Sequence, residues 1–101
     1  IRFLDDMEGV THGYSYFPIL IDKEKFGKSR DELYEHLKSH NIYSRRYFYP
    51  LISSFEPYNT LEGSTPNNLK VAHKAAENVL CLPIFVELED KQVVDIVNLL
   101  S

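Results

Sequence analysis

The chain has 101 residues, of which 44% are hydrophobic and 13% aromatic. This length allows one domain with a modest core and leaves no room for a large enclosed active site. The formal net charge of −4 disfavours a protein that binds nucleic acid over its whole surface, because a phosphate backbone is usually met by a basic face.

Cysteine content and hydropathy bear on the compartment. Cys81 is the only cysteine, so no disulfide forms within one chain, and we expect a reducing, cytoplasmic location. No apolar stretch approaches the roughly 20 residues of a membrane-spanning helix. We therefore expect no membrane partner and no nucleic-acid partner.

The first half of the chain predicts a linker, a strand and a helix. Residues 1–13 are acidic and lack a sustained hydrophobic period, which predicts a partly disordered linker. The aromatic and β-branched run Tyr14–Ile21 predicts a strand, which Pro18 places at a sheet edge or a bulge. Ser29 and Glu32 have the spacing of a capping box, and apolar residues then recur at helical spacing, so a helix is predicted from Ser29 to about Ser39.

A second strand is predicted over about Ile42–Tyr49, where side chains should alternate between two faces. One face would carry Tyr43, Arg45, Tyr47 and Tyr49, and the other Ser44, Arg46 and Phe48. The two neighbouring arginines should therefore point apart. Residues 50–68 contain three prolines and predict a long irregular loop.

The remaining elements are a helix of small residues over about 69–79, a nearly all-apolar third strand over 80–85 and a last helix over about 90–100. This order predicts an α+β fold spanning residues 14–101. We expect a two-layer sandwich, in which three helices cover one side of a small, three-stranded, mainly antiparallel sheet. The apolar third strand should insert antiparallel between the first two.

The stretch Asn41–Pro50 is the most distinctive feature, because it sets Arg45 and Arg46 among four aromatic residues. A guanidinium binds phosphate or carboxylate with paired hydrogen bonds, and tyrosine rings offer flat faces to a sugar or a base. The alternative is that the arginines are solvated or paired with carboxylates and that the tyrosines only pack. No metal site is expected, since His36 and His40 lack a third ligand.

Four segments, in this order, resemble the C-terminal portion of the DegT/DnrJ/EryC1/StrS family of pyridoxal-phosphate-dependent sugar aminotransferases of fold type I. They are Tyr16–Ile19, Ser29–Leu33, Asn41–Leu51 and Ala72–Ile84. The resemblance implies the small domain of a homodimeric parent, whose missing N-terminal domain holds the cofactor and its lysine. The lysines of this chain sit in polar contexts, so we expect it to have no cofactor site or catalytic residue and to be inactive alone.

The resemblance also implies a substrate, a nucleotide-linked keto-sugar of cell-surface polysaccharide or lipopolysaccharide biosynthesis. Arg46 and Tyr47 match positions at which the family brings side chains near the cofactor and the sugar, and Tyr49 and the following proline complete the motif. Arg45 is expected to bind substrate phosphate or to be structural. Ile52 departs from the pattern, because many relatives have a histidine there. The candidate substrate-binding residues are thus Arg45, Arg46, Tyr47 and Tyr49, whereas Arg30 and Lys38 are expected to be solvated and unimportant to turnover.

Two alternatives stay open. Sugar dehydratases that use the same cofactor share the family, and the sequence does not separate them from transaminases. A free-standing α+β module that binds a small molecule or a protein is the other. Exposure of the aromatic face, which includes Tyr16, Tyr43, Tyr47 and Tyr49, separates a fragment from such a module, because a fragment exposes what its parent would cover.

Overall fold

The computed structural model describes residues 1–101 and has an α+β fold. Its strands are β1 (Arg2–Phe3), β2 (Phe17–Leu20) and β3 (Val79–Leu82), and its α-helices are α1 (Lys23–Phe26), α2 (Arg30–Ser39), α3 (Lys70–Asn78) and α4 (Asp90–Leu99). Three short 3-10 helices, η1 (Ile52–Ser54), η2 (Tyr58–Thr60) and η3 (Glu62–Ser64), lie between α2 and α3. The predicted fold class, with its three-stranded antiparallel sheet, is confirmed.

The sheet has the order β1-β2-β3, with both pairs antiparallel. Ile19 of β2 lies opposite Leu80 of β3. On the other side of β3, Cys81 forms a single antiparallel bridge with Arg45. The third predicted strand therefore does lie antiparallel between the first one and the arginine segment. The outer strand β1 comes from residues predicted as a linker; the division at residue 13 stays a prediction.

The predicted strand Ile42–Tyr49 is wrong, because only Arg45 pairs with a neighbour. At its start, the Ile42 amide donates to the Leu37 carbonyl and so completes the end of α2. Beyond Arg45, Phe48 adopts a left-handed conformation with φ of 48°, which turns the chain away from the sheet. The prediction that side chains of this segment alternate between two strand faces is therefore also wrong.

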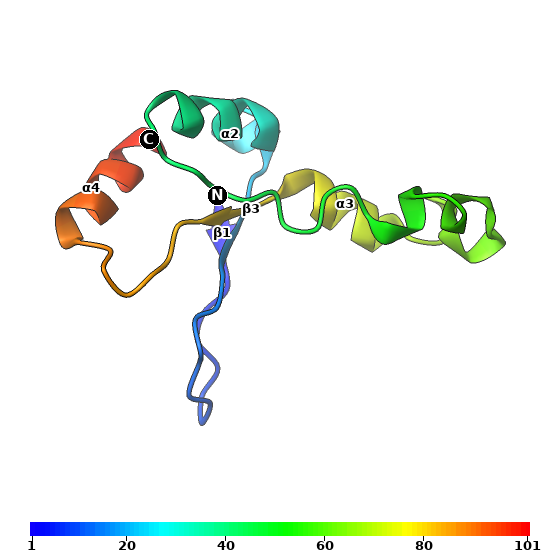
Figure 1. Cartoon of the computed structure of the whole chain (residues 1–101), viewed down its shortest axis with the longest axis horizontal. Helices are drawn as coiled ribbons and strands as arrows, with labels where there is room; N and C mark the ends of the chain where they lie inside the picture. The colour runs from blue at the N-terminus through cyan, green and yellow to red at the C-terminus, as the bar shows by residue number, and fades with distance from the viewer.

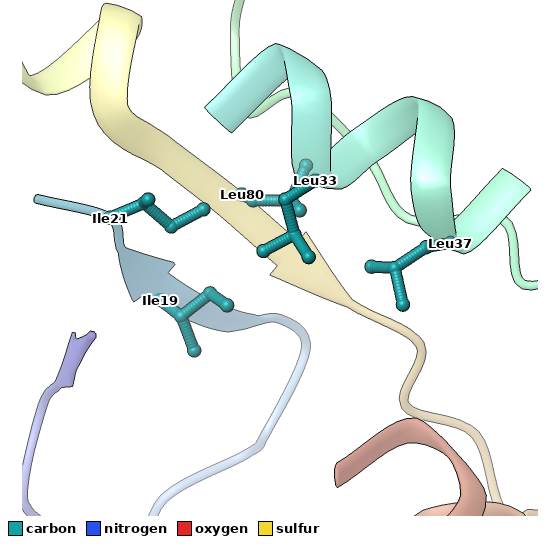
Figure 2. Packing of buried hydrophobic residues seen from close by; sticks show 5 residues of the cluster. All are labelled: Ile19, Ile21, Leu33, Leu37 and Leu80. Carbon is teal, nitrogen blue, oxygen red and sulfur yellow. The ribbon is translucent and has the colours of Figure 1, made fainter. Parts of the chain in front are cut away.

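The core forms where α2 lies across β2 and β3 (Figure 2). It consists of five fully buried side chains: Ile19, Ile21, Leu33, Leu37 and Leu80. Leu33 and Leu37 point from one face of α2 towards the sheet because they are one helical turn apart. Burial of each such side chain is worth roughly 1.5–3 kcal/mol, so this small cluster contributes substantially to the fold's stability.

Helix α2 begins as the sequence predicts. The Glu32 amide donates to the Ser29 hydroxyl oxygen at 3.2 Å, and the Ser29 amide donates to the Glu32 carboxylate at 2.7 Å. These reciprocal bonds satisfy two backbone donors that the helix itself leaves free.

The molecule is spread out rather than round. Helix α3 and the 3-10 helices extend to one side of the sheet, α4 lies on the other, and residues near the N-terminus form a third projection (Figure 1). The radius of gyration is 15.6 Å, whereas a compact domain of 100 residues has about 13 Å. Within the segment 51–69, which we call the 3-10 arm, no residue is buried, and its main-chain hydrogen bonds join residues of the arm itself, except that the Leu69 carbonyl accepts from the His73 amide of α3.

Candidate functional site

The arginine segment is fixed to the sheet at one residue. The Arg45 amide donates to the Cys81 carbonyl at 2.9 Å, and the Cys81 amide donates to the Arg45 carbonyl at 2.8 Å. Residues 46–50 make no main-chain hydrogen bond. Side-chain contacts therefore decide where this part of the chain lies.

Arg46 and Tyr49 turn towards the start of α2. The Arg46 guanidinium carbon lies 4.8 Å from the centre of the Tyr34 ring and 5.4 Å from that of Tyr49. Its Nη1 also donates to Asp31 Oδ1 at 3.4 Å. Such a cation over an aromatic ring is worth about 0.5–1 kcal/mol where it is exposed to water. The structure thus brings Arg46 and Tyr49 together and engages both with α2.

Tyr47 lies in a different place. Its ring packs against Tyr16, with 5.1 Å between ring centres, and against Phe48, with 4.3 Å. The Tyr47 hydroxyl makes no hydrogen bond within the chain. Tyr47 lines a groove of about 280 Å³ together with N-terminal residues that include Asp6 and Tyr14. Tyr47 is thus placed beside a groove and has a hydroxyl without a partner in the chain.

Asp6 and Tyr14 interact within this groove. The Tyr14 hydroxyl donates to Asp6 Oδ2, and this hydrogen bond raises the pKa of Tyr14 above its ordinary value, with smaller contributions from desolvation and from the carboxylate charge. The phenol is therefore protonated over the whole neutral range.

Arg45 faces a third place, a hollow of about 430 Å³ against β3. The hollow is lined by Ser15, Tyr16, Tyr43, Arg45, Cys81, Leu82, Pro83, Ile84 and Phe85. Arg45 is exposed and forms no ion pair, unlike Arg46. Burial raises the pKa of the Cys81 thiol, and the nearby Arg45 charge offsets only part of this shift. The thiol stays protonated at neutral pH and does not act as a nucleophile.

The four candidate residues therefore lie at three places instead of on two strand faces. Arg46 and Tyr49 are against α2, Tyr47 is in the N-terminal groove, and Arg45 is in the hollow beside β3. Arg45 and Arg46 do have different surroundings, as expected of side chains that point apart, although no strand extends over the two residues.

The prediction that Arg30 is solvated is wrong. Its exposed fraction is 2%, and Arg30 is the only charged residue among the ten buried residues of the chain. Its guanidinium carbon lies 4.6 Å from the centre of the Tyr49 ring. The sequence carried a weak signal for this burial, because Arg30 is the first residue of α2, where the helix dipole disfavours a cation.

The aromatic face is open, as predicted from the sequence. Tyr43 is 71% exposed, Tyr49 47% and Tyr16 37%, and only Tyr47 is half-buried.

The model of the DegT/DnrJ/EryC1/StrS aminotransferase family matches residues 2–101. The chain belongs to this family. It is 53% identical over 87 residues, or 86% of its length, to dTDP-4-amino-4,6-dideoxy-D-glucose transaminase of Escherichia coli. Over 75 residues, or 74% of its length, it is 48% identical to the Shigella dysenteriae protein of the same name. An uncharacterized protein of Methanocaldococcus jannaschii is 30% identical over 92 residues, or 88% of the chain.

The chain spans only part of these DegT/DnrJ/EryC1/StrS relatives. The matched region covers 23%, 20% and 23% of their respective lengths.

None of the lysines of this family member is placed like the cofactor lysine of a pyridoxal-phosphate-dependent aminotransferase. That cofactor needs a lysine in a desolvated pocket. Six of the lysines here are exposed, and the seventh, Lys28, is only partly covered.

No group of three or more His, Cys, Asp or Glu side chains is placed to hold a metal ion. No helix has the length and apolarity needed to cross a membrane.

Proposed function

We propose that this chain is part of a longer, pyridoxal-phosphate-dependent aminotransferase that acts on a nucleotide-linked keto-sugar. In this proposal the chain supplies substrate contacts, and the cofactor and its lysine belong to the rest of the protein. Pyridoxal phosphate there would supply the amino-group transfer. The relatives named as transaminases of a dTDP-linked amino sugar support this substrate class.

The hollow around Arg45 is the observation that carries the proposal. A guanidinium that no carboxylate neutralises can bind a diphosphate with paired hydrogen bonds. Tyr16, Tyr43 and Phe85 line the same hollow and offer aromatic surface to a base or a sugar ring. Tyr47, which contacts Tyr16, has a free hydroxyl that would orient a sugar hydroxyl.

The surface of the chain supports the view that it is one part of a larger body. Large apolar side chains are exposed on several sides, with Val86 98% exposed. Monomeric proteins rarely leave contiguous apolar surface uncovered. An N-terminal cofactor domain would cover the aromatic face in the longer protein. We extend the proposal to a homodimeric, cytoplasmic enzyme of cell-surface polysaccharide or lipopolysaccharide biosynthesis, as the family resemblance implies.

The test is amino-group transfer by the longer protein to dTDP-linked keto-sugars, followed by mass spectrometry of the product. We expect an amino sugar to form, and Arg45→Met to raise the KM for the nucleotide sugar roughly tenfold or more, the effect of losing a charged hydrogen bond. Lys38→Met, which removes an exposed charge from α2, is the matched control. Absence of product with every nucleotide-linked keto-sugar would contradict the proposal, as would an unchanged KM in Arg45→Met.

A further inference from the structure

Arg30 is a buried charge with several partners. Its side chain is only 1% exposed and its Nε lies 2.8 Å from Asp31 Oδ1, although this N–H is not aligned for a hydrogen bond. Keeping a charge away from water is unfavourable unless partners surround it. A side chain placed at such a cost must be held by specific contacts.

The first contact is with the junction between α3 and β3. Arg30 Nη1 donates to the Ala76 carbonyl at 2.8 Å and to the Val79 carbonyl at 3.4 Å. The Ala76 carbonyl is in the last turn of α3, where carbonyls lack partners within the helix and a cation is favourable. Arg30 thus joins the start of α2 to the end of α3, 46 residues further along the chain.

The second contact is with the arginine segment. Because residues 46–50 make no main-chain hydrogen bond, their path depends on the side chains that hold them. The Tyr49 ring lies against the guanidinium of Arg30 at 4.6 Å and against that of Arg46 at 5.4 Å. Asp31 is within ion-pair distance of both arginines. Of the two cations, only Arg30 is anchored in the core.

We propose that Arg30 is a positioning residue for substrate binding, which acts through Tyr49 to set the path of residues 46–50. The predicted effect on substrate binding rests on the proposed function, whereas the contact between Arg30 and Tyr49 does not. Arg30 does not touch the substrate. Its buried guanidinium provides a fixed flat surface for the Tyr49 ring, and the position of Tyr47, two residues earlier, follows from it.

The contact itself is tested by NMR on the 101-residue chain. In the wild type, the buried Arg30 Nε–H should exchange slowly with water, whereas that of exposed Arg45 exchanges fast. Arg30→Met should shift the ring resonances of Tyr49, and Lys38→Met, on the same helix, should leave them unchanged. If the Tyr49 resonances do not move in Arg30→Met, the inference is overturned, whatever the longer protein does.

The consequence is tested by steady-state kinetics of the longer protein. Arg30→Lys keeps a cation near α3 but lacks the flat guanidinium face. We expect it to raise the KM for the nucleotide sugar about three- to tenfold, the range of a cation–aromatic contact. The KM for the amino donor should stay within about twofold. Equal values of both KM in Arg30→Lys and the wild type would show that Arg30 only stabilises the fold.

A double substitution separates action through Tyr49 from an independent effect. In the Tyr49→Leu background, the further change Arg30→Lys should alter the nucleotide-sugar KM by less than about twofold. If the two effects instead multiply, Arg30 does not act through Tyr49 and the inference fails. Should Arg30→Met not fold, Arg30→Lys takes its place in the NMR test, where it should likewise shift the Tyr49 ring resonances and an unchanged Tyr49 signal overturns the inference. The kinetic test uses only Arg30→Lys and Tyr49→Leu. A wild-type longer protein that turns over no nucleotide-linked sugar overturns the proposed function instead, and the NMR result is unaffected.

Discussion

Arg45 and Arg46 are neighbours in sequence with opposite surroundings. Arg46 is engaged by Asp31 and by the rings of Tyr34 and Tyr49, whereas Arg45 has no carboxylate partner. A positive charge that is already neutralised attracts an anion less than a free one does. We therefore propose Arg45, rather than Arg46, as the phosphate ligand, whereas Arg46 contacts α2 and holds the segment there.

The hydroxyl of Tyr47 is the second feature of the candidate site that can be tested by substitution. Its hydroxyl has no partner within the chain, so Tyr47→Phe should leave stability unchanged and remove only a contact to substrate. We expect kcat/KM for the nucleotide sugar in the longer protein to fall by a factor that corresponds to about 1 kcal/mol or more. Tyr58→Phe, which alters an exposed tyrosine of the 3-10 arm, is the control. Equal kcat/KM in Tyr47→Phe and the wild type would leave Tyr47 with a packing role alone.

The residue types of the candidate site were predictable from the sequence, but their directions were not. Guanidinium and phenol chemistry follows from Arg45 and Tyr47 alone. Where each side chain points depends on the left-handed turn at Phe48 and on the position of α2, which are set by contacts distant in sequence. Arg30 was missed for the same reason, since its partners Ala76 and Val79 lie more than 40 residues away.

Among the elements, α2 was predicted almost to the residue and the strand Ile42–Tyr49 was not. The capping box that starts α2 is a local feature, in which Ser29 and Glu32 satisfy each other's backbone amides. A strand, in contrast, exists only where a neighbour supplies hydrogen bonds, and β3 reaches this segment at Arg45 alone. Aromatic and β-branched composition measures how well a segment suits a sheet, not whether it has a partner there.

The capping box predicts how stability depends on pH. The Ser29 amide, and after it the Ser29 hydroxyl, donate to the Glu32 carboxylate and lower its pKa below the ordinary 4.5. A carboxyl whose pKa is lower in the folded state stabilises the fold above its unfolded-state pKa and loses that effect as the pH falls through the folded-state value. Urea unfolding of the wild type should therefore show stability falling below about pH 4.5.

Two variants check the capping assignment. Glu32→Gln retains a capping side chain but cannot titrate, so its loss of stability in acid should be smaller than that of the wild type. Ser29→Ala should lower the free energy of unfolding by about 1 kcal/mol at neutral pH. Glu35→Gln, on an exposed part of the same helix, should have the same free energy of unfolding as the wild type at neutral pH and in acid. An acid response of Glu32→Gln equal to that of the wild type would show that other carboxylates cause the effect.

The whole molecule consists of a core cluster of five buried side chains from which the three projections extend. Leu80 is fully buried between β2 and α2, so Leu80→Ala should lower the free energy of unfolding by about 2–5 kcal/mol. A chain of about 100 residues has only about 5–15 kcal/mol in total, and this one has a small core. Val86→Ala, at a 98% exposed position, should change it by less than about 0.5 kcal/mol. Similar urea midpoints for the two variants would place the stabilising core elsewhere.

The 3-10 arm has a consequence for how such proteins diversify. Apart from one bond from the His73 amide to the Leu69 carbonyl at its end, its main-chain hydrogen bonds begin and end within residues 51–69, and none of its side chains is buried. Insertions, deletions and wholesale replacement between Leu51 and Leu69 therefore leave Leu33, Leu37 and Leu80 in place, and lengthening a loop twofold costs only about 0.6 kcal/mol. The sequence of this segment can therefore change in evolution without changes in the core, and a protein engineer can exchange it between homologues.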